Sequence, residues 1–442
     1  MKTTGQWLMF LVWLALLPAA AGAQEWVQLN TRGPTPPHRS RAAAIYDPQA
    51  HRLVIFGGTS PLGNLNDIWA LDLHTLEWAD LTPPTDGPTP GPRLTPSAVY
   101  DPKGHRMLMW SGQGDEGFFN DLWAFDLAQG TWAELSPAGE VPNPRYGTVS
   151  ALDPVSGEMA VFAGFTDEGR FGDTWRYGLG SGVWTRIFER EGPGLRCLHS
   201  ASFDRQGGRM VIYGGQRSGP LDDIWAFDFA TNTWTELTPQ QRPPGRMFTA
   251  QVYDVYHRRA LLFGGNLGGQ VRTNEVWAFD LQTNTWQLLQ PQGAPPPERD
   301  GAVAVYVERE GRVVVFGGGG SGVTLYQDTW SLEGISPPVP TAVSETAGLP
   351  LKFTLGQNSP NPANPATTIT YELAAPAAVR LGIFDLLGRQ VRQLAEGMRP
   401  AGQHTATWDG LNQQGRRAGS GIYLYRLETP AGSEVRKLAL IR

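Results

Sequence analysis

Six arginines recur along the chain at intervals of 50–54 residues. A guanidinium group keeps its positive charge and donates paired hydrogen bonds, so it can bind a carboxylate, sulfate or phosphate group of a ligand. Each repeat also contains an acidic residue just before a tryptophan, and each arginine could instead pair with that acid and serve the fold. Both interpretations remain open from the residues alone. The arginines are Arg39, Arg93, Arg145, Arg196, Arg246 and Arg299, and the acids are Asp67, Asp121, Asp173, Asp223, Glu275 and Asp328.

A second set of candidate ligand-binding residues occurs once each instead of in every repeat. A residue present in every repeat more often serves the architecture, so side chains that interrupt the pattern are better candidates for binding. They fall in or near the connections whose sequences differ between repeats. The set comprises Arg41, Arg170, His199, Arg217 and Tyr326, together with His38, Phe118 and Phe119.

The single cysteine, Cys197, cannot form an intramolecular disulfide. As a nucleophile it would need a base, and His199 is two residues away only in sequence. A buried structural thiol is therefore the simpler interpretation. The seven histidines show no His-x-His or His-x3-His spacing, so we expect no metal site.

Each repeat contains four short segments with β-strand character, separated by turn residues. In the second repeat these segments are PSAVY, RMLMWSG, LWAFDL and TWAEL. A pair of small residues ends the second segment of every repeat, and Ser111 and Ala163 replace the first glycine of that pair in two of them. Tryptophans in the third and fourth segments supply bulk that can pack one sheet on the next. The pattern predicts an all-β chain.

This combination resembles kelch repeats, which form β-propellers with four-stranded blades. The resemblance covers residues 25–334 and implies a six-bladed propeller over residues 24–334. The sixth repeat lacks its fourth segment, whereas the unpaired segment 25–29 around Trp26 has that segment's pattern. We therefore expect residues 25–29 to complete the last blade and to remove the open edge of the ring.

Two of the four kinds of connection vary between repeats: those from the second to the third strand, and those from one blade to the next. Because strands alternate in direction, both kinds emerge on one face of the propeller, here called the variable face. Binding residues concentrate on loops held by a rigid framework. We therefore predict that the variable face, around the central channel, binds a glycan or a protein, and that the six arginines surround the mouth of the channel.

An enzymatic function is the alternative. Kelch-type propellers include a copper radical oxidase family that requires histidine and tyrosine ligands and a Cys–Tyr thioether. His51, His105 and His257 are expected in hairpins on the opposite face, which leaves His38 and His199. A second kelch group acts on sialic acid with carboxylates and arginines, so isomerase or lyase chemistry stays open. The favoured function is binding, with no catalytic residue, metal or cofactor assigned.

The composition and the N-terminus predict an exported globular protein. The 442 residues include 54 glycines and 36 prolines, which argues against a helical bundle, and a formal charge of −6 argues against a nucleic-acid partner. Residues 1–23 have the order of a signal peptide, with cleavage expected between Ala23 and Gln24. Their apolar run is too short to span a bilayer, so we expect no transmembrane segment in the mature chain.

The C-terminal quarter of the chain departs from the repeat. Residues 335–350 are rich in proline and typical of a linker, and residues 351–442 predict a small antiparallel β-sandwich. The motifs NSPNPANPATTITYEL, IFDLLGRQV, QHTATWDG and SGIYLYRL resemble the C-terminal sorting domain of type IX secretion cargo, an immunoglobulin-like domain related to the flagellar hook-scaffolding domain. The matching positions are Asn358, Pro360, Asn361, Pro362, Asn364, Pro365, Asp385, Gly388, Trp408, Asp409, Gly410, Gly421, Tyr423 and Lys437.

This second resemblance implies a Gram-negative bacterium. The signal peptide would direct the chain to the periplasm, and the type IX secretion machinery would then carry it across the outer membrane. The product would be extracellular or held on the outer-membrane surface, with attachment to lipopolysaccharide after cleavage of the sorting domain as one outcome. An adhesive sandwich without a sorting role is the alternative.

Overall fold

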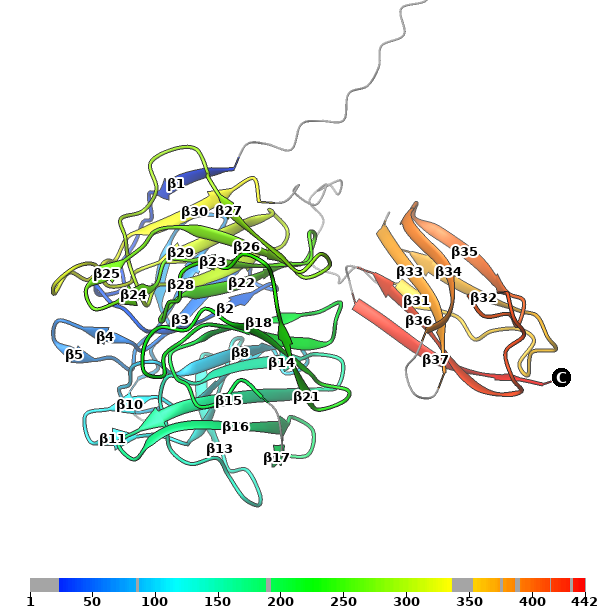
Figure 1. Ribbon diagram of the computed structural model, residues 1–442, viewed down its shortest axis with the longest axis horizontal. Coiled ribbons are helices and arrows are strands. Elements are labelled where there is room, and N and C mark those ends of the chain that lie inside the picture. Colours follow the sequence, from blue (N-terminus) through cyan, green and yellow to red (C-terminus); the bar gives the residue numbers. More distant parts are fainter. Residues whose placement is uncertain are drawn as a thin grey trace, which may run out of the picture. The chain divides into compact units, whose positions relative to one another are not determined.

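A computed structural model describes residues 24–84, 87–187, 192–335, 353–373, 377–385, 390–413, 415–429 and 432–441 (Figure 1). The predicted signal peptide with Ala23, most of the predicted linker, and Gly388 lie outside these residues. The chain divides into two compact units, Met1–Thr341 and Ala342–Arg442.

The described part of the first unit contains six four-stranded antiparallel sheets. Their innermost strands contact one another in a closed circle, so the sheets are the blades of a six-bladed propeller. We number the blades 1 to 6 in the order of these innermost strands. They are β2 (Ala43–Asp47), β8 (Ser97–Asp101), β14 (Val149–Asp153), β18 (Ser200–Asp204), β22 (Ala250–Asp254) and β28 (Val303–Val307).

The second and third strands of each blade form most of the core, because their apolar runs are buried on both faces by the neighbouring blades. The second strands are β3 (Arg52–Phe56), β9 (Arg106–Trp110), β15 (Glu158–Thr166), β19 (Arg209–Tyr213), β23 (Arg259–Phe263) and β29 (Arg312–Phe316). The third strands are β6 (Ile68–Asp72), β12 (Leu122–Asp126), β16 (Gly169–Gly178), β20 (Ile224–Asp228), β26 (Val276–Asp280) and β30 (Thr329–Glu333).

Each outermost strand buries one tryptophan whose neighbours along the strand face solvent, and the strand of blade 5 also buries Leu289. This alternation is the expected pattern of an edge strand with one face on the core. In blades 1 to 5 these strands are β7 (Trp78–Asp80), β13 (Thr131–Leu135), β17 (Val183–Ile187), β21 (Thr233–Leu237) and β27 (Thr285–Leu289).

The outermost strand of blade 6 comes from the other end of the unit. The strand β1 (Glu25–Leu29) pairs antiparallel with β30, with Trp26 opposite Leu332. In Figure 1 the dark blue β1 accordingly lies beside the yellow β30. This pairing joins the first and last segments of the ring and leaves blade 6 with four strands like the others.

Short hairpins extend the connections between second and third strands. They are β4 (Thr59–Ser60) with β5 (Gly63–Asn64), β10 (Gln113–Gly114) with β11 (Gly117–Phe118), and β24 (Asn266–Gly268) with β25 (Val271–Arg272). All three project on the same side of the propeller, on the left in Figure 1. That side is the variable face.

The small-residue pair that ends each second strand takes a left-handed backbone. Ser111 and Ala163 adopt φ values of 66° and 56°, close to the 65° of Gly57 in blade 1. A Cβ atom at Gly57 would lie 2.9 Å from the carbonyl oxygen of Arg93, which is why most blades use glycine here. Blades 2 and 3 therefore keep the turn despite their substitutions.

The propeller extends one residue further than the sequence predicts. Ile335, assigned to the linker, is only 2% exposed and packs in the cluster of Trp26 and Leu332. Its carbonyl oxygen accepts a hydrogen bond of 2.8 Å from Arg259. The apolar side chain of Ile335 therefore belongs to the core of the propeller.

The second unit is a β-sandwich whose core includes Trp408, Tyr425 and Leu427. One sheet contains β31 (Phe353–Leu355), β32 (Thr367–Leu373) and β35 (Gly402–Trp408). The other contains, in order, β34 (Gln390–Arg399), β33 (Ala377–Phe384), β36 (Gly421–Thr429) and β37 (Gly432–Leu440).

Candidate functional site

The six repeated arginines are almost completely buried, and each binds the acidic residue of its own blade. In blade 3, Arg145 is 1% exposed, and its Nη1 and Nη2 donate to the two carboxylate oxygens of Asp173 at 2.5 and 3.0 Å. Its Nη1 also donates to the carbonyl oxygen of Ala163, and the same carboxylate accepts from the indole of Trp175. The corresponding pairs are Arg39–Asp67, Arg93–Asp121, Arg196–Asp223, Arg246–Glu275 and Arg299–Asp328.

The main chain of each arginine also joins neighbouring blades. The amide of Gly164 in blade 3 donates to the carbonyl oxygen of Arg196 in blade 4 at 3.0 Å. The same bond recurs around the ring, and Gly318 donates to Arg39 at 2.9 Å between blades 6 and 1. Each arginine therefore connects two blades, its main chain to one and its side chain to the other.

These contacts favour the interpretation that Arg39, Arg93, Arg145, Arg196, Arg246 and Arg299 serve the fold over the interpretation that they contact a ligand. Their guanidinium groups face acids and carbonyl oxygens within the blade and have little surface left. Tyr326, another predicted ligand residue, covers Arg299 with its ring at 4.1 Å, as Phe119 covers Arg93 at 3.8 Å. These aromatic rings also serve the framework.

Three of the acids in these pairs, Asp173, Asp223 and Asp328, have a pKa below the ordinary value of aspartate. Burial by itself would raise the pKa of Asp223, but hydrogen bonds from Arg196 and the positive charge of that residue outweigh it and lower the pKa below its ordinary value of 3.8. The pKa values of Asp173 and Asp328 are lowered in the same way by Arg145 and Arg299. The ring of buried charges is therefore internally neutralised.

Two residues after each arginine, the chain takes a left-handed turn in all six blades. Such a backbone is ordinary for glycine, and blades 3 and 6 have glycine there. The other four blades have larger side chains, including a β-branched threonine, for which this conformation costs about 1–2 kcal/mol each. The residues and their φ values are Arg41 (59°), Thr95 (48°), Gly147 (64°), Leu198 (59°), Phe248 (55°) and Gly301 (60°).

Hydrogen bonds connect these six residues into a ring. The amide of Thr95 donates to the carbonyl oxygen of Arg41 at 2.8 Å, and Phe248 donates to Leu198 at 3.0 Å. The amide of Gly147 donates instead to the hydroxyl oxygen of Thr95 at 3.3 Å. The left-handed backbone allows this ring, so the framework imposes the conformation whatever side chain is present.

The ring surrounds a hollow of about 140 Å³ at the mouth of the central channel on the variable face. All six blades contribute to it, each through the left-handed residue and the residue that follows. Besides the ring, the lining consists of Ala42, Pro96, Thr148, His199, Thr249 and Ala302. The backbone conformation around the hollow is the same in all six blades, whereas the side chains differ from blade to blade. This arrangement is expected of a binding site.

Backbone strain supports the same assignment. Residues in costly conformations persist where the surrounding structure holds them, and they concentrate at functional sites. Arg41, Leu198 and Phe248 occupy positions where two other blades use glycine without losing the ring. The strain at these three positions therefore makes their side chains candidates for a role at the hollow.

His199 is the predicted site residue that the structure places most clearly at the hollow. It is 6% exposed, and neither ring nitrogen has a hydrogen-bond partner among the described residues. Burial, and to a lesser degree the charge of Arg196, lowers the pKa of His199 well below 6.5, so the ring is neutral at pH 7. Both nitrogens are shielded from solvent, and the ring meets buried Phe162 edge-on at 5.4 Å. His199 therefore packs into the core beside the hollow, where a polar group without a partner costs about 1–3 kcal/mol.

Arg170 and Cys197 lie beside the hollow, next to an aromatic cluster. Tyr146 stacks on Phe118 at 5.8 Å and meets Phe165 edge-on at 5.7 Å. Burial raises the pKa of the Cys197 thiol, with Arg170 acting in the opposite direction. Cys197 is therefore a protonated structural thiol and not a reactive nucleophile.

The remaining predicted residues lie away from the hollow. Arg217 is exposed in a loop of blade 4, and the Nδ1 of His38 hydrogen-bonds to the carbonyl oxygen of Leu325 at 2.8 Å. His51 and His105 bind carboxylates at first-to-second-strand hairpins, opposite the variable face. Within the described ranges, no three or more His, Cys, Asp and Glu residues cluster as metal ligands would.

Ten of the twelve lining residues were not among the sequence candidates, and those with larger side chains include Thr95, Leu198, Phe248 and Thr249. The signal that could have found them is their register, two or three positions after a repeated arginine. Counting from the arginines shows side chains of very different size and polarity at one repeated position.

Several motif residues of the C-terminal unit form hydrogen bonds within it, and Asn361 contacts its last strand, β37. The side-chain oxygen of Asn361 accepts from the amide of Ala439 at 3.0 Å, and the amide of Asn358 donates to the hydroxyl of Tyr425 at 2.9 Å. Trp408 is fully buried and donates to Leu411. The side chains of Asp409 and Tyr423 form hydrogen bonds with nearby main chain, and the carbonyl oxygen of Lys437 accepts from the side chain of Gln357.

Most of the other described motif residues are exposed, namely Pro360, Pro362, Asn364, Pro365 and Gly421. Gly410 lies against Pro365, and Asp385 follows β33.

No helix within the described part of the chain has the length and hydrophobicity needed to cross a membrane.

Known proteins resemble the chain in two separate regions. The KLHDC2/KLHL20/DRC7 Kelch-repeats domain matches residues 18–193, 81–265 and 187–336, and the FlgD Ig-like domain matches residues 359–433. Multiple epidermal growth factor-like domains protein 8 of mouse is 28% identical over 205 residues, which are 44% of this chain and 7% of that protein. Human host cell factor 1 is 26% identical over 212 residues, which are 43% of this chain and 10% of that protein.

The chain thus spans a tenth or less of the length of these two relatives. The Kelch-repeats matches together extend over more than half of the chain and coincide with the six blades. The protein therefore belongs to the kelch-repeat family, as a six-bladed β-propeller followed by a FlgD Ig-like domain.

Proposed function

We propose that the propeller is a non-catalytic recognition module that binds a glycan or a protein through the hollow on its variable face. The observation that carries the proposal is the ring of left-handed residues, where one repeated backbone position presents arginine, threonine, leucine and phenylalanine to a shared space. The residues that line the hollow include no carboxylate. This lining supports recognition over acid–base chemistry by paired carboxylates.

The test uses the mature chain, residues 24–442, on printed arrays of glycans and of peptides. The double variant Arg41→Gly/Phe248→Gly removes two stacked side chains together and is expected to lose binding by about tenfold or more. Arg205→Ala removes a charge from an exposed turn between β18 and β19, on the opposite face, and should bind normally. Full binding by the double variant would contradict the assignment of the site.

We also propose that the C-terminal unit directs export through the type IX secretion system. Support comes from the FlgD Ig-like match, which suggests a bacterial protein that works outside the cytoplasm, and from the sorting-domain motifs. The Asn-Pro segment runs beside β37, where the amide of Ala363 donates to Ala439 at 2.7 Å. That segment and the last strand together form one surface for the secretion machinery to read.

Export is tested in a bacterium with a working type IX system. The full chain with its signal peptide is expected in the medium or on the cell surface, whereas a chain truncated after Ile335 should accumulate in the periplasm. The truncation leaves the described propeller complete, so it tests sorting and not folding. Export of the truncated chain to the same extent would refute the sorting role.

A further inference from the structure

Three neighbouring blades each expose one aliphatic side chain in the connection between their second and third strands. Leu62 of blade 1 is 99% exposed, Val271 of blade 5 is 58% exposed and Val323 of blade 6 is 97% exposed. Blades 5, 6 and 1 follow one another around the ring, so these three residues, here called the aliphatic tips, lie on one half of the variable face. In Figure 1 the hairpins β4–β5 and β24–β25, from blades 1 and 5, project on the same side.

The connections that carry the aliphatic tips stand clear of the rest of the propeller. Each contains a glycine close to its tip residue, and a Cβ atom at Gly63, Gly269 or Gly322 would meet no atom within 4 Å beyond the adjoining residues. The tips therefore project as separate apolar side chains. A rigid protein partner would need three matching pockets to cover them, whereas a fluid lipid layer accepts separate side chains wherever they enter.

The backbone of these connections is hydrogen-bonded within each connection. A backbone amide or carbonyl without a partner is costly to move away from water, so internal bonding prepares a loop for an apolar environment. The bonds run from the amide of Leu62 to the hydroxyl oxygen of Ser60 (3.1 Å), from the amide of Gly268 to the side-chain oxygen of Asn266 (2.8 Å), and from the amide of Gly320 to the carbonyl oxygen of Thr324 (2.9 Å).

The same three connections carry almost no charge. Residues 57–66, 264–271 and 317–327 include no acidic or basic side chain, and the adjoining Arg272 is paired with Asp300 at 2.9 Å. Moving a charge out of water is costly, so only this half of the variable face is suited to an apolar medium. The connections of blades 2, 3 and 4 contain instead the charged residues Asp115, Glu116, Asp167, Glu168, Arg170 and Arg217.

We propose that Leu62, Val271 and Val323 dock the propeller on an uncharged lipid surface, by entering the boundary between its headgroups and acyl chains. Such binding grows with the apolar area that leaves water, and all three side chains now face water. The formal charge of −6 gives the chain no attraction to anionic lipid, so apolar contact drives the docking. The residues that line the hollow do not include the three tips, and the lipid contact is therefore separate from the proposed recognition site.

The test is flotation of the mature chain with vesicles of pure phosphatidylcholine and with vesicles of equal parts phosphatidylcholine and phosphatidylglycerol. The chain is expected to float with pure phosphatidylcholine at least as well as with the mixture, and added salt should not release it. Each of Leu62→Ser, Val271→Ser and Val323→Ser should weaken vesicle binding by about tenfold, because one apolar side chain no longer leaves water. The triple variant should remain unbound.

A matched control lies on the other side of the propeller. Val155 is 67% exposed in the hairpin between β14 and β15, opposite the variable face, so Val155→Ser should bind vesicles as wild type does. A fluorophore that brightens in apolar surroundings, attached to Leu62→Cys, should brighten on vesicles, whereas the same label on Val155→Cys should not. Cys197 is 2% exposed and leaves the introduced thiol as the site of labelling.

The serine substitutions replace exposed side chains, so each variant is expected to unfold at the wild-type temperature, and lost binding would not reflect misfolding. Absence of vesicle binding by the unchanged chain would overturn the proposal, and so would undiminished binding by the triple variant. If the unchanged chain ignores vesicles and the triple variant loses binding on the peptide array, the tips contact a protein instead. Retained array binding by the triple variant is expected, because the hollow is intact.

Discussion

Asp223→Ala is expected to destabilise the propeller by about 3–5 kcal/mol, because it leaves a buried positive charge without its partner. The side chain of Arg196 is 2% exposed and donates to both carboxylate oxygens of Asp223 at 2.8 and 2.7 Å. The indole of Trp225 loses its acceptor in the same variant. Urea unfolding followed by tryptophan fluorescence measures the change.

The neighbouring acid provides a matched control. Asp222 is 55% exposed and lies 3.7 Å from Arg242, so Asp222→Ala should cost about 0–1 kcal/mol. Equal changes in unfolding free energy for the two variants would show that the buried pair stabilises the propeller no more than the exposed pair does.

The pH dependence supplies a second readout of this pair. The pKa of Asp223 is lower in the folded chain than its ordinary value of 3.8. The stabilisation that the ionised carboxylate gives to the folded chain is therefore present above pH 3.8 and is lost as the pH falls through the folded-state pKa. The difference between wild type and Asp223→Ala should therefore shrink in acid.

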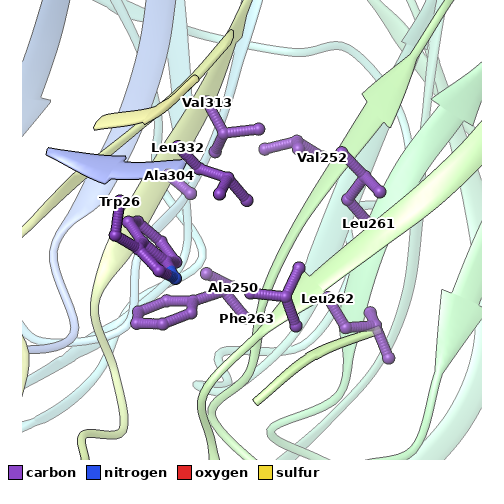
Figure 2. A pocket seen from close by; sticks show the side chains of 10 residues that line it. Trp26, Ala250, Val252, Leu261, Leu262, Phe263, Ala304, Val313 and Leu332 are labelled. Atoms are coloured by element: carbon purple, nitrogen blue, oxygen red, sulfur yellow. The ribbon is translucent and has the colours of Figure 1, made fainter. Parts of the chain in front are cut away.

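Trp26→Ala is expected to cost about 3–5 kcal/mol, and deletion of residues 24–30 at least as much. Trp26 is 4% exposed and meets Phe263 of blade 5 with ring centroids 5.1 Å apart. Figure 2 shows that the two rings lie near the side chains of Val252, Leu261, Val313 and Leu332. These side chains line a gap with a volume of only about 10 Å³. Alanine would leave a large apolar cavity between two blades and would weaken the closure of the ring.

The adjacent position separates packing from strand pairing. Val27 is 38% exposed, so Val27→Thr keeps the β-branched strand residue and should change stability by less than about 0.5 kcal/mol. Thermal unfolding of the mature chain compares the three variants with wild type. An unchanged melting temperature after deletion of residues 24–30 would contradict the role of β1 in closing the propeller.

Much of the fold could be predicted because its signals are local and repeated. The small-residue pair, the tryptophans and the turn residues return in each repeat, so one blade predicts the next. The segment around Trp26 was identifiable because the sixth repeat lacked a matching strand, and β1 does pair with β30. The end of the propeller was placed one residue early, because nothing near Ile335 in sequence indicates that it is buried.

The site was harder to predict, for reasons that individual residues show. Arg41 and Arg39 are two positions apart and chemically identical, yet Arg39 is buried against Asp67 and Arg41 lies over Phe248. Phe248 is 207 positions from Arg41 in the sequence. The regular spacing of six arginines could identify the variable face. It could not show which guanidinium groups on that face are already paired with an acid.

The sequence by itself determined the all-β class, the number of blades, the closing strand and the separate C-terminal domain, because strand and turn preferences act between residues close in the chain. Only the tertiary structure decided that six arginines belong to the framework and that His199 is buried without a partner. Closing the ring brings together residues about fifty positions apart in each successive blade. The burial of these residues between blades and the hydrogen-bonded ring of left-handed residues arise only from that closure, so no single repeat contains them.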